Sequence, residues 1–309
     1  MISELKAGMK FCQAAIVKVQ RIGKSSNGNF FARGFLEDSS GSTSFVCFAA
    51  EAVDFLRNLE TVDAFMVNGV VDINKYAGDN QSLVVIIHSL SNLLPEDDVS
   101  NLLPHGDFDL EQYKAKLSEL IKSVKTPVLY SLLENIFSGA VYEQFVHNPA
   151  GTKMHHAYTG GLLQHSVDTA QLAVAMADKI GDVNKDLVIA GALLHDIGKL
   201  KEISSRVGFP YTDEGRLLGH IAISAMLIQE TAARLRIPVG RIEQLLHIVL
   251  SHHGEQDKGS PIACATREAF IVHYADEVNA VMNQFETASG KNSWSFNKML
   301  QRNIFIERV

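Results

Sequence analysis

Cysteine is scarce in this chain of 309 residues. The three cysteines, Cys12, Cys47 and Cys264, are odd in number, and no two of them are spaced as Cys-x-x-Cys. Disulfide frameworks and thiolate zinc sites need more cysteines at closer spacing. The sequence therefore argues against both, and it fits a protein kept in a reducing compartment.

Secretion signals and membrane-spanning runs are also absent from the sequence. Residues 1–10 mix Glu4, Lys6 and Lys10 with no apolar centre, unlike a secretory signal peptide. No apolar run approaches the ~20 residues that cross a bilayer. We expect a soluble, cytoplasmic protein with no membrane partner.

A surplus of positive charge is missing too. The formal net charge is −7, and 46% of the residues are hydrophobic, as in a globular protein with a buried core. Residues 1–95 hold 8 Lys and Arg against 9 Asp and Glu, and the remainder holds 20 against 26. Proteins that bind nucleic acid through overall charge are basic. Any nucleic-acid contact must therefore depend on a local groove, on stacking or on metal ions.

Residues 10–90 have the pattern of short strands. Five β-rich, roughly alternating segments are separated by turn signals, including one around 78–80, with a helix-like piece between the third and fourth. The strands are expected at 14–19, 30–36, 43–48, 64–71 and 83–87, and the helix at 50–58. This is the element order of an OB-fold, a small β-barrel used for oligonucleotides. We predict a five-stranded OB-fold domain over residues 1–95.

Adjacent aromatic residues mark the second of these strands. Phe30 and Phe31 must point to opposite faces of a strand, so one of them faces outward, where it can stack on a base. Arg33 shares the face of Phe31 and can contact a phosphate. A barrel this small also needs Phe in its core, and a surface Arg can simply be solvated. With those alternatives open, we predict Phe30, Phe31 and Arg33 as nucleic-acid-binding residues.

The second part of the chain has a helical pattern. Residues 96–108 contain prolines and acidic residues that break any periodicity, and we predict a linker there. Asp109 is a typical N-cap, and helices are expected at 110–123 and 128–137. The helical pattern then continues to the end of the chain. We predict that residues 109–309 form an all-α domain.

Histidine and aspartate recur at the ends or on the apolar faces of five predicted helices. These residues are His165, His195-Asp196, His220, His252-His253 and Asp276. Each has a structural explanation on its own, because a lone His on an apolar helix is usually a packed core residue. Together they offer nitrogen and oxygen ligands with no thiolate, a set that favours Mn²⁺, Fe²⁺ or Mg²⁺ over structural zinc.

The order of these residues, with the string LLHDIGK at 193–199, resembles the HD-domain metal-dependent phosphohydrolases. Finer features resemble the YhaM-type 3′–5′ exoribonucleases, which carry an OB domain ahead of the HD domain. Those features are the strings HHAYTGGLLQH at 155–165, SHHG at 251–254 and HYAD at 273–276. The resemblance implies an HD core at about 155–285. One departure is Asn279, where relatives are expected to have Asp.

The resemblance also implies a site. His165, His195, Asp196 and Asp276 would hold one divalent metal, and Asp196 would bridge to a second metal held by His220 and by His252 or His253. The metals would be two Mn²⁺ ions, with Fe²⁺, Co²⁺ or Mg²⁺ as alternatives. Lys199 would neutralise a phosphate oxygen, unless it only complements a helix C-terminus. His155 and His156 would contact the substrate phosphate or the leaving group, and Asp196 would be essential for catalysis.

The function implied is hydrolysis of single-stranded RNA from its 3′ end, with single-stranded DNA as a further substrate. One alternative is an HD-domain phosphohydrolase acting on a small nucleotide or cyclic dinucleotide. Residues 254–257, GEQD, stand where cyclic-di-GMP phosphodiesterases would have Gly-Tyr-Pro, which argues against this alternative. A second alternative is a non-catalytic nucleic-acid-binding protein, against which stands the presence of every expected ligand. The sequence leaves the oligomeric state open, with a homo-oligomer as one option.

Overall fold

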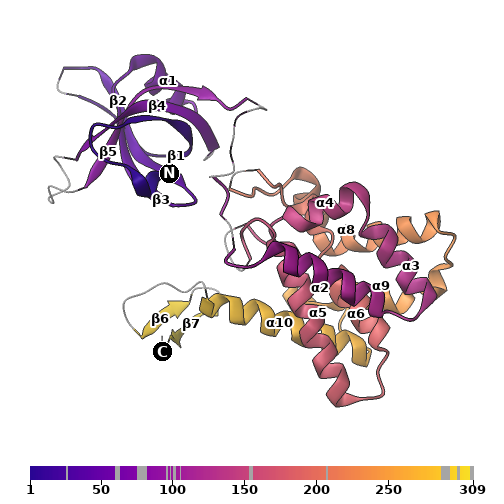
Figure 1. Ribbon diagram of the computed structural model, residues 1–309. Helices are drawn as coiled ribbons and strands as arrows, with labels where there is room; N and C mark the ends of the chain where they lie inside the picture. The colour runs from indigo at the N-terminus through magenta and orange to yellow at the C-terminus, as the bar shows by residue number, and fades with distance from the viewer. Residues whose placement is uncertain are drawn as a thin grey trace. The chain divides into compact units, whose positions relative to one another are not determined.

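The chain divides into two compact units, Met1–His105 and Gly106–Val309, and each is described by itself (Figure 1). The computed structural model describes residues 1–25, 27–59, 63–74, 82–94, 97, 99, 102–104, 106–152, 156–206, 208–286, 293–297 and 300–306. The predicted turn around 78–80 and much of the predicted linker at 96–108 lie outside these residues.

The first unit is a closed barrel of five strands. A short 3-10 helix, η1 (Ile2–Glu4), precedes β1 (Lys10–Lys24), β2 (Phe30–Asp38), β3 (Gly41–Cys47), α1 (Ala50–Arg57), β4 (Asp63–Ile73) and β5 (Leu83–Asn92). The strand order around the barrel is β1-β2-β3-β5-β4, and β3 pairs with β5 in parallel. The predicted five-stranded barrel, with a helix between its third and fourth strands, is confirmed.

Alternation along β2 separates the barrel core from its surface. Ala32 and Leu36 are fully buried, whereas Arg33 and Phe35 face outward. Gly34 faces inward against β1, where a methyl group would overlap the carbonyl oxygen of Lys18. Glycine therefore permits the close approach of β1 and β2 next to the irregularity in their register after Val19.

The second unit is helical up to its last segment. Its helices are α2 (Leu110–Ser123), α3 (Pro127–Ile136), α4 (Gly139–His147), α5 (Gly161–Ile180), α6 (Lys185–Leu194), α7 (Lys199–Glu202), α8 (Asp213–Arg234), α9 (Glu243–Ser251) and α10 (Arg267–Glu286), with 3-10 turns η3 (Val239–Arg241) and η4 (Gln256–Lys258). Side chains cap several N-termini. Asp109 accepts from the Gln112 amide at the start of α2 at 3.0 Å, as its N-cap role predicts.

Helix α6 is the centre of this unit. Every residue from Leu187 to Leu194 is buried, and a helix that is apolar all round must be enclosed by others. Helices α5, α9 and α10 pack against it. Gly191 touches Ile248 of α9, where a larger side chain would overlap it. The C-terminal end of α6, which carries His195 and Asp196, is thus fixed in the middle of the helical unit.

The end of the chain differs from the prediction. Residues 294–305 form a hairpin of two strands, β6 (Trp294–Asn297) and β7 (Arg302–Phe305), so the expectation of helix up to the end is wrong there. Trp294 and Phe296 alternate with polar residues, which is the period of a strand. Among the residues described, no helix combines the length and the apolar character needed to cross a bilayer.

Candidate metal centre

The turn between α6 and α7 supplies the two central groups. His195 is the C-cap of α6, and the Lys199 amide donates to the Asp196 carbonyl at 2.9 Å, which folds the chain back on itself. A methyl group at Gly198 would overlap the carbonyl oxygen of His220 on α8. The Gly198 amide also donates to the Ser224 hydroxyl at 2.8 Å. Gly198 therefore lets α8 lie directly against the turn between α6 and α7.

A break in α8 directs His220 to the same place. Gly219 has φ 73° and ψ 151°, which is not helical, and helical residues lie on both sides of it. His220 Nε2 lies 3.4 Å from Asp196 Oδ1 as a result.

The first ligand cluster joins α5, the end of α6 and α10. His165, His195 and Asp276 each offer a ligand atom, and these atoms all lie within 4.8 Å of one another. His165 Nε2 is 3.1 Å from His195 Nε2 and 3.1 Å from Asp276 Oδ1. The Asp196 Oδ2 atom completes the group at 3.4 Å from His165 Nε2 and 3.3 Å from His195 Nε2.

The second ligand cluster joins α8 to the end of α9. His220, His252 and His253 also offer ligand atoms within 4.8 Å of one another. Both His220 Nε2 and His252 Nε2 face the Asp196 Oδ1 atom, the latter at 3.6 Å. Burial lowers the pKa of both His252 and His253, which keeps these rings neutral and able to act as ligands.

Asp196 is shared by the two clusters. Its Oδ2 atom faces His165 and His195, and its Oδ1 atom faces His220 and His252. Burial alone would raise the pKa of this carboxyl group, but the charge of Lys199 and the nearby histidines outweigh burial and hold the pKa well below its usual range. The carboxylate is therefore ionised, with one oxygen available to each cluster.

Hydrogen bonds on the far side of the rings fix their tautomers. The Nδ1 atoms of His195 and His252 donate to the carbonyl oxygens of Ala192 and Val249, each at 2.7 Å. The Nδ1 atom of His165 donates to Asn279 Oδ1 at 2.7 Å, and that of His220 donates to Glu202 Oε1 at 3.0 Å. In a neutral imidazole the opposite Nε2 atom is then a lone-pair donor. All four Nε2 atoms point toward Asp196.

These observations fit a site for bound metal ions. Asp196 Oδ1, His220 Nε2 and His252 Nε2 are buried and have no hydrogen-bond partner in the described part of the chain. Buried polar atoms without partners are costly, and they indicate an ion or water that completes them. Nitrogen and oxygen donors without thiolate suit Mn²⁺, Fe²⁺, Co²⁺ or Mg²⁺. The chemistry of the donors therefore suits a divalent metal ion.

Lys199 and His156 lie beside the first cluster. Lys199 Nζ is 2.6 Å from Asp196 Oδ2, and although burial lowers the pKa of this amine, attraction to Asp196 outweighs it and raises the pKa. The His156 ring packs edge-on against the His165 ring, with 5.2 Å between centroids, and stacks on Tyr158. His156 has φ 53°, and its amide donates to Asn283 Oδ1 at 3.0 Å. His155 lies outside the described residues.

Two side chains around the centre were missed from the sequence. Glu202 accepts from both the amide and the ring of His220, each at 3.0 Å. His273 donates from Nδ1 to the His252 carbonyl at 2.7 Å and braces the end of α9. Glu202 belongs to a polar run with no motif to mark it, whereas His273 stood in the HYAD string and could have been proposed.

The predicted nucleic-acid-binding residues lie on the barrel. Phe30 is 41% exposed, with the Arg57 guanidinium over its ring at 4.0 Å. Phe31 is half-buried and Arg33 is exposed on the outer face of β2. Arg33 stands directly opposite Arg21 of β1, a juxtaposition of like charges that is unfavourable without an anion nearby. The sequence prediction missed Arg21.

Exposed aromatic side chains extend this outer face of the barrel. Phe35 is 41% exposed and Phe48 is 60% exposed. The Phe31 and Phe48 rings lie 6.2 Å apart between centroids, close enough to form one platform. Neither Phe35 nor Phe48 was predicted, because a barrel core requires several phenylalanines and the sequence does not show which remain outside.

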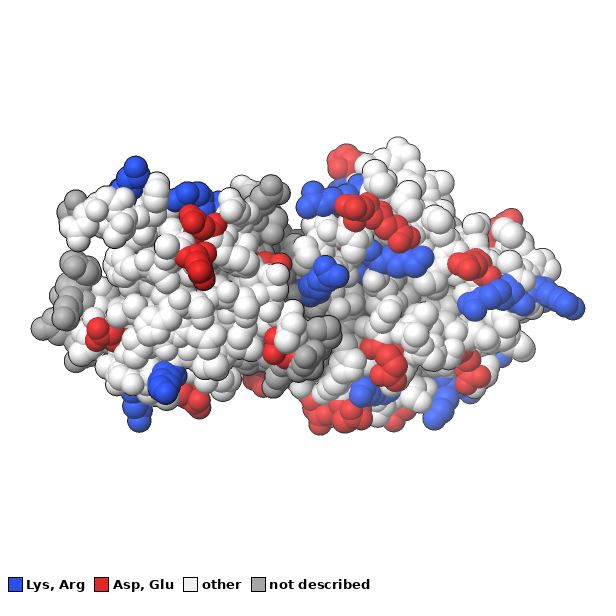
Figure 2. Space-filling view, turned by 90° about the horizontal axis from the view of Figure 1, so that it is seen from above, with Lys and Arg blue, Asp and Glu red and all other residues white. Residues whose placement is uncertain are grey.

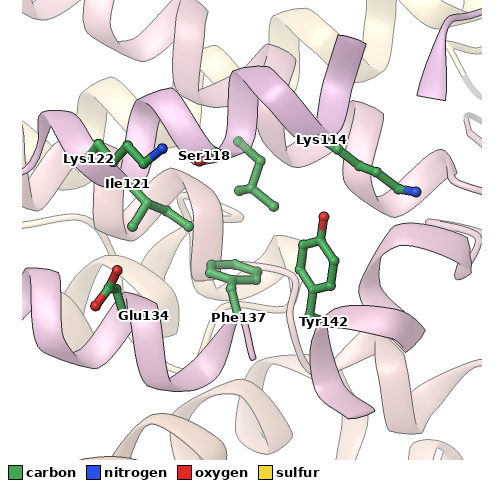
Figure 3. Close-up of a pocket in the computed structure, with 8 residues that line it drawn as sticks. Lys114, Ser118, Ile121, Lys122, Glu134, Phe137 and Tyr142 are labelled. Carbon is green, nitrogen blue, oxygen red and sulfur yellow. The ribbon is translucent and has the colours of Figure 1, made fainter. Parts of the chain in front are cut away.

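A separate pocket lies between α2 and the segment from α3 to α4 (Figure 3). Its volume is about 260 Å³, and the rings of Phe137 and Tyr142 point from below toward α2. Lys114 and Lys122 line its rim, and Lys114 is paired with Glu111 at 2.7 Å. None of the histidines of the two clusters lines this pocket, so we assign it no part in the metal centre.

Comparisons with known proteins identify similar solved structures and a matching family model. Two solved structures are similar to this chain, the HD domain of the L. monocytogenes phosphodiesterase PgpH and the same domain in complex with cyclic-di-AMP. The first structure is 21% identical to this chain, and the match covers 50% of this chain and 78% of the other, with a TM-score of 0.32. The second is 22% identical, and the match covers 50% of this chain and 76% of the other, with a TM-score of 0.31. A family model described as HD domain matches residues 162–281, so this part of the chain is an HD domain.

Proposed function

We propose that this chain is a metal-dependent 3′–5′ exoribonuclease that cleaves single-stranded RNA, with single-stranded DNA as a second substrate. The observation that carries the proposal is Asp196, whose two oxygens face two separate clusters of histidines. Paired metal sites of this kind are typical of enzymes that hydrolyse phosphodiesters. We place the enzyme in the cytoplasm, because three cysteines without Cys-x-x-Cys spacing fit a reducing compartment.

The proposed metal ligands are the members of the two clusters. His165, His195, Asp196 and Asp276 would hold one ion, and Asp196, His220 and His252 the other, with His253 as an alternative or additional ligand. When bound, two Mn²⁺ ions, or Fe²⁺, Co²⁺ or Mg²⁺ in their place, would activate water and stabilise negative charge on the phosphate and on the leaving oxygen.

The protein itself orients and charges the site. Asn279 and Glu202 hold the rings of His165 and His220 with their Nε2 atoms inward, so no reorganisation is needed when substrate binds. The Lys199 ammonium is held at the centre by Asp196 and would neutralise a nonbridging phosphate oxygen. His156, and His155 before it, would contact the phosphate or donate a proton to the leaving oxygen.

The barrel would bind the single-stranded RNA. The face shown in Figure 2 carries charges of both signs, and with a net charge of −7 the chain as a whole does not attract RNA. Stacking is worth about 1–3 kcal/mol per base, and the Phe31–Phe48 pair offers a platform for it. Phe30 would add a further ring, and Arg33 with Arg21 would hold a phosphate between them.

End-labelled RNA tests the proposal. With Mn²⁺, a 5′-labelled strand should shorten stepwise while a 3′-labelled strand releases labelled mononucleotide at once, and EDTA should stop both. Hydrolysis of a cyclic dinucleotide or small nucleotide with RNA left intact would favour that alternative substrate instead. Binding of RNA without metal-dependent cleavage of any nucleotide would leave only a binding protein.

A further inference from the structure

The face of α10 that points away from the metal centre is apolar. Phe270, Tyr274, Val278 and Met282 recur at every fourth position and are 45%, 50%, 46% and 50% exposed. At ~100° per residue, Tyr274 and Val278 lie on the side of the helix opposite Asp276. The other side is buried in the core of the unit through Val272 and Ala275. A helix that is apolar on both sides is normally enclosed on both.

The charged side chains of α10 do not serve this outer face. Apart from Asp276 in the metal centre, the described ones are already satisfied within the chain. Arg267 pairs with Asp182, Glu268 accepts from the Asn184 amide at 2.8 Å, and Glu277 lies 3.6 Å from Lys258. The stripe formed by Phe270, Tyr274, Val278 and Met282 therefore offers apolar contact. It offers no charge to a nucleic acid or an acidic partner.

The terminal hairpin adds exposed aromatic side chains next to the C-terminal end of α10. Asn297 of β6 donates to Gln284 Oε1 of α10 at 3.3 Å, which ties the hairpin to the helix. Trp294, Phe296 and Phe305 are 63%, 57% and 44% exposed. Since an aromatic side chain can bury about 150–250 Å², the five aromatic side chains at roughly half exposure offer about 500 Å², to which Val278 and Met282 add. A stable interface buries about 800 Å² per partner.

We propose that α10 and the terminal hairpin form a self-association surface, which binds the same surface of a second copy of this chain. In an antiparallel pairing with its two-fold axis at Val278, the two valines meet and Tyr274 faces Met282 across the axis. An aromatic ring against a thioether is a favourable contact, and the arrangement satisfies both halves of the interface with one sequence. Because Asp276 lies on the opposite side of α10, both metal centres remain open.

Sedimentation velocity of the full chain at micromolar concentrations tests this surface. The wild-type protein should be a dimer, and Val278→Glu should raise the dissociation constant at least about 100-fold, because two carboxylates would meet on the axis. Met282→Glu should weaken the dimer as well. Met226→Glu is the matched control, since Met226 is a similarly exposed methionine on α8, and it should remain dimeric.

A cross-link tests the pairing without relying on loss of association. In a Cys12→Ser background, Val278→Cys should form a disulfide-linked dimer under mild oxidation, and Met226→Cys should not. Hydrolysis of a model diester by Val278→Glu should be unchanged, which separates this proposal from the proposed function. A monomeric wild-type protein, a Val278→Glu protein as dimeric as wild type, or equal cross-linking of both cysteine variants would each overturn it.

Discussion

His165 Nε2 lies 3.1 Å from His195 Nε2, although the Nδ1 atoms of both rings already donate to oxygens on their outer sides. Two neutral rings would thus turn lone pairs toward each other. In the metal-free protein, a proton on one of these Nε2 atoms removes the repulsion between the two lone pairs. Burial lowers the pKa of His165, but its contacts with Asp196 and Asp276 outweigh burial and raise the pKa to about 9. The centre is built to hold positive charge, and a cation would replace this proton.

The stability of the metal-free protein should therefore depend on pH. A histidine whose pKa rises from 6.5 in the unfolded chain to about 9 in the folded one contributes stability that is complete below about pH 6.5 and is lost as the pH rises through 9. In EDTA, the unfolding temperature should fall between these values. With saturating Mn²⁺ the fall should vanish, and in His165→Gln it should be absent. A flat profile for the wild-type protein in EDTA would contradict this account of His165.

Asp196→Asn should abolish hydrolysis while leaving the helical fold intact. The amide removes the charge that faces both clusters, so at least one metal ion should be lost, and turnover of a model diester should fall by about 10²–10³-fold or more. Metal content and circular dichroism of the purified variant give the two readouts. Asp178→Asn, which removes an exposed carboxylate paired with Lys185, is the control. Activity retained at saturating metal would refute the bridging role of Asp196.

Much of the fold could be predicted because local patterns agree with it. The alternating pattern at 30–36 predicted a strand with side chains on opposite faces, and β2 confirms it. The hairpin at 294–305 was missed, since its strands are only four residues each and follow a long helix. Short segments give too few positions for a period of two to be distinguished from a period of 3.6.

The candidate site was predictable for a different reason. The proposed ligands sit at a helix end, at a helix break or, like His165 and Asp276, inside an apolar helix, and a polar residue in such a setting is noticeable in the sequence. Glu202 and Arg21 were not noticeable, because their roles arise from partners 18 and 12 positions away, His220 and Arg33. Such contacts are set by packing between elements, which a single sequence does not show. The roles of Lys199 and His156 in catalysis remain predictions.

Asn279 should tune metal affinity through His165. Asn279→Ala removes the acceptor of His165 Nδ1, so the ring loses its orientation and the affinity for metal should fall by about 10–100-fold. Asn279→Asp keeps an acceptor and adds a charge that makes the ring more basic, so its affinity should equal or exceed that of the wild-type protein. Titration with Mn²⁺ by calorimetry measures both. Equal losses in the two variants would show that Asn279 acts only through packing.

Glu202 should matter for the second cluster alone. Glu202→Ala leaves His220 Nδ1 without its acceptor, and we expect the protein to keep one tightly bound ion while the other weakens by about 10–100-fold. Stoichiometry at limiting metal distinguishes the two ions. Glu214→Ala, which removes an exposed partner of Lys201, is the control and should bind two ions as the wild-type protein does.

Arg33 should contribute to RNA binding through charge. Replacing it with Ala should lower the affinity for single-stranded RNA, and the slope of log K against log salt should become shallower by about 0.7, the value for one phosphate contact on a single strand. Phe31→Ala should weaken binding without changing the slope, because stacking is not electrostatic. Lys18→Ala is the control, since Lys18 is already paired with Glu37. An unchanged slope in Arg33→Ala would remove the barrel face from the proposal.

Gly198 should be indispensable for a structural reason. A methyl group there would overlap the His220 carbonyl oxygen and crowd the Ser224 amide, both of α8, so α8 must move away from the turn. Overpacking of this kind costs about 1–3 kcal/mol or more, and we expect Gly198→Ala to lower the free energy of unfolding in EDTA by that amount. Because the shift carries His220 away from Asp196, the second ion should also bind more weakly. Gly240→Ala is the control, since nothing lies within 4 Å of a methyl group at that position. If Gly198→Ala were as stable as Gly240→Ala and bound two ions, close packing of α8 against the turn would not explain why residue 198 is glycine.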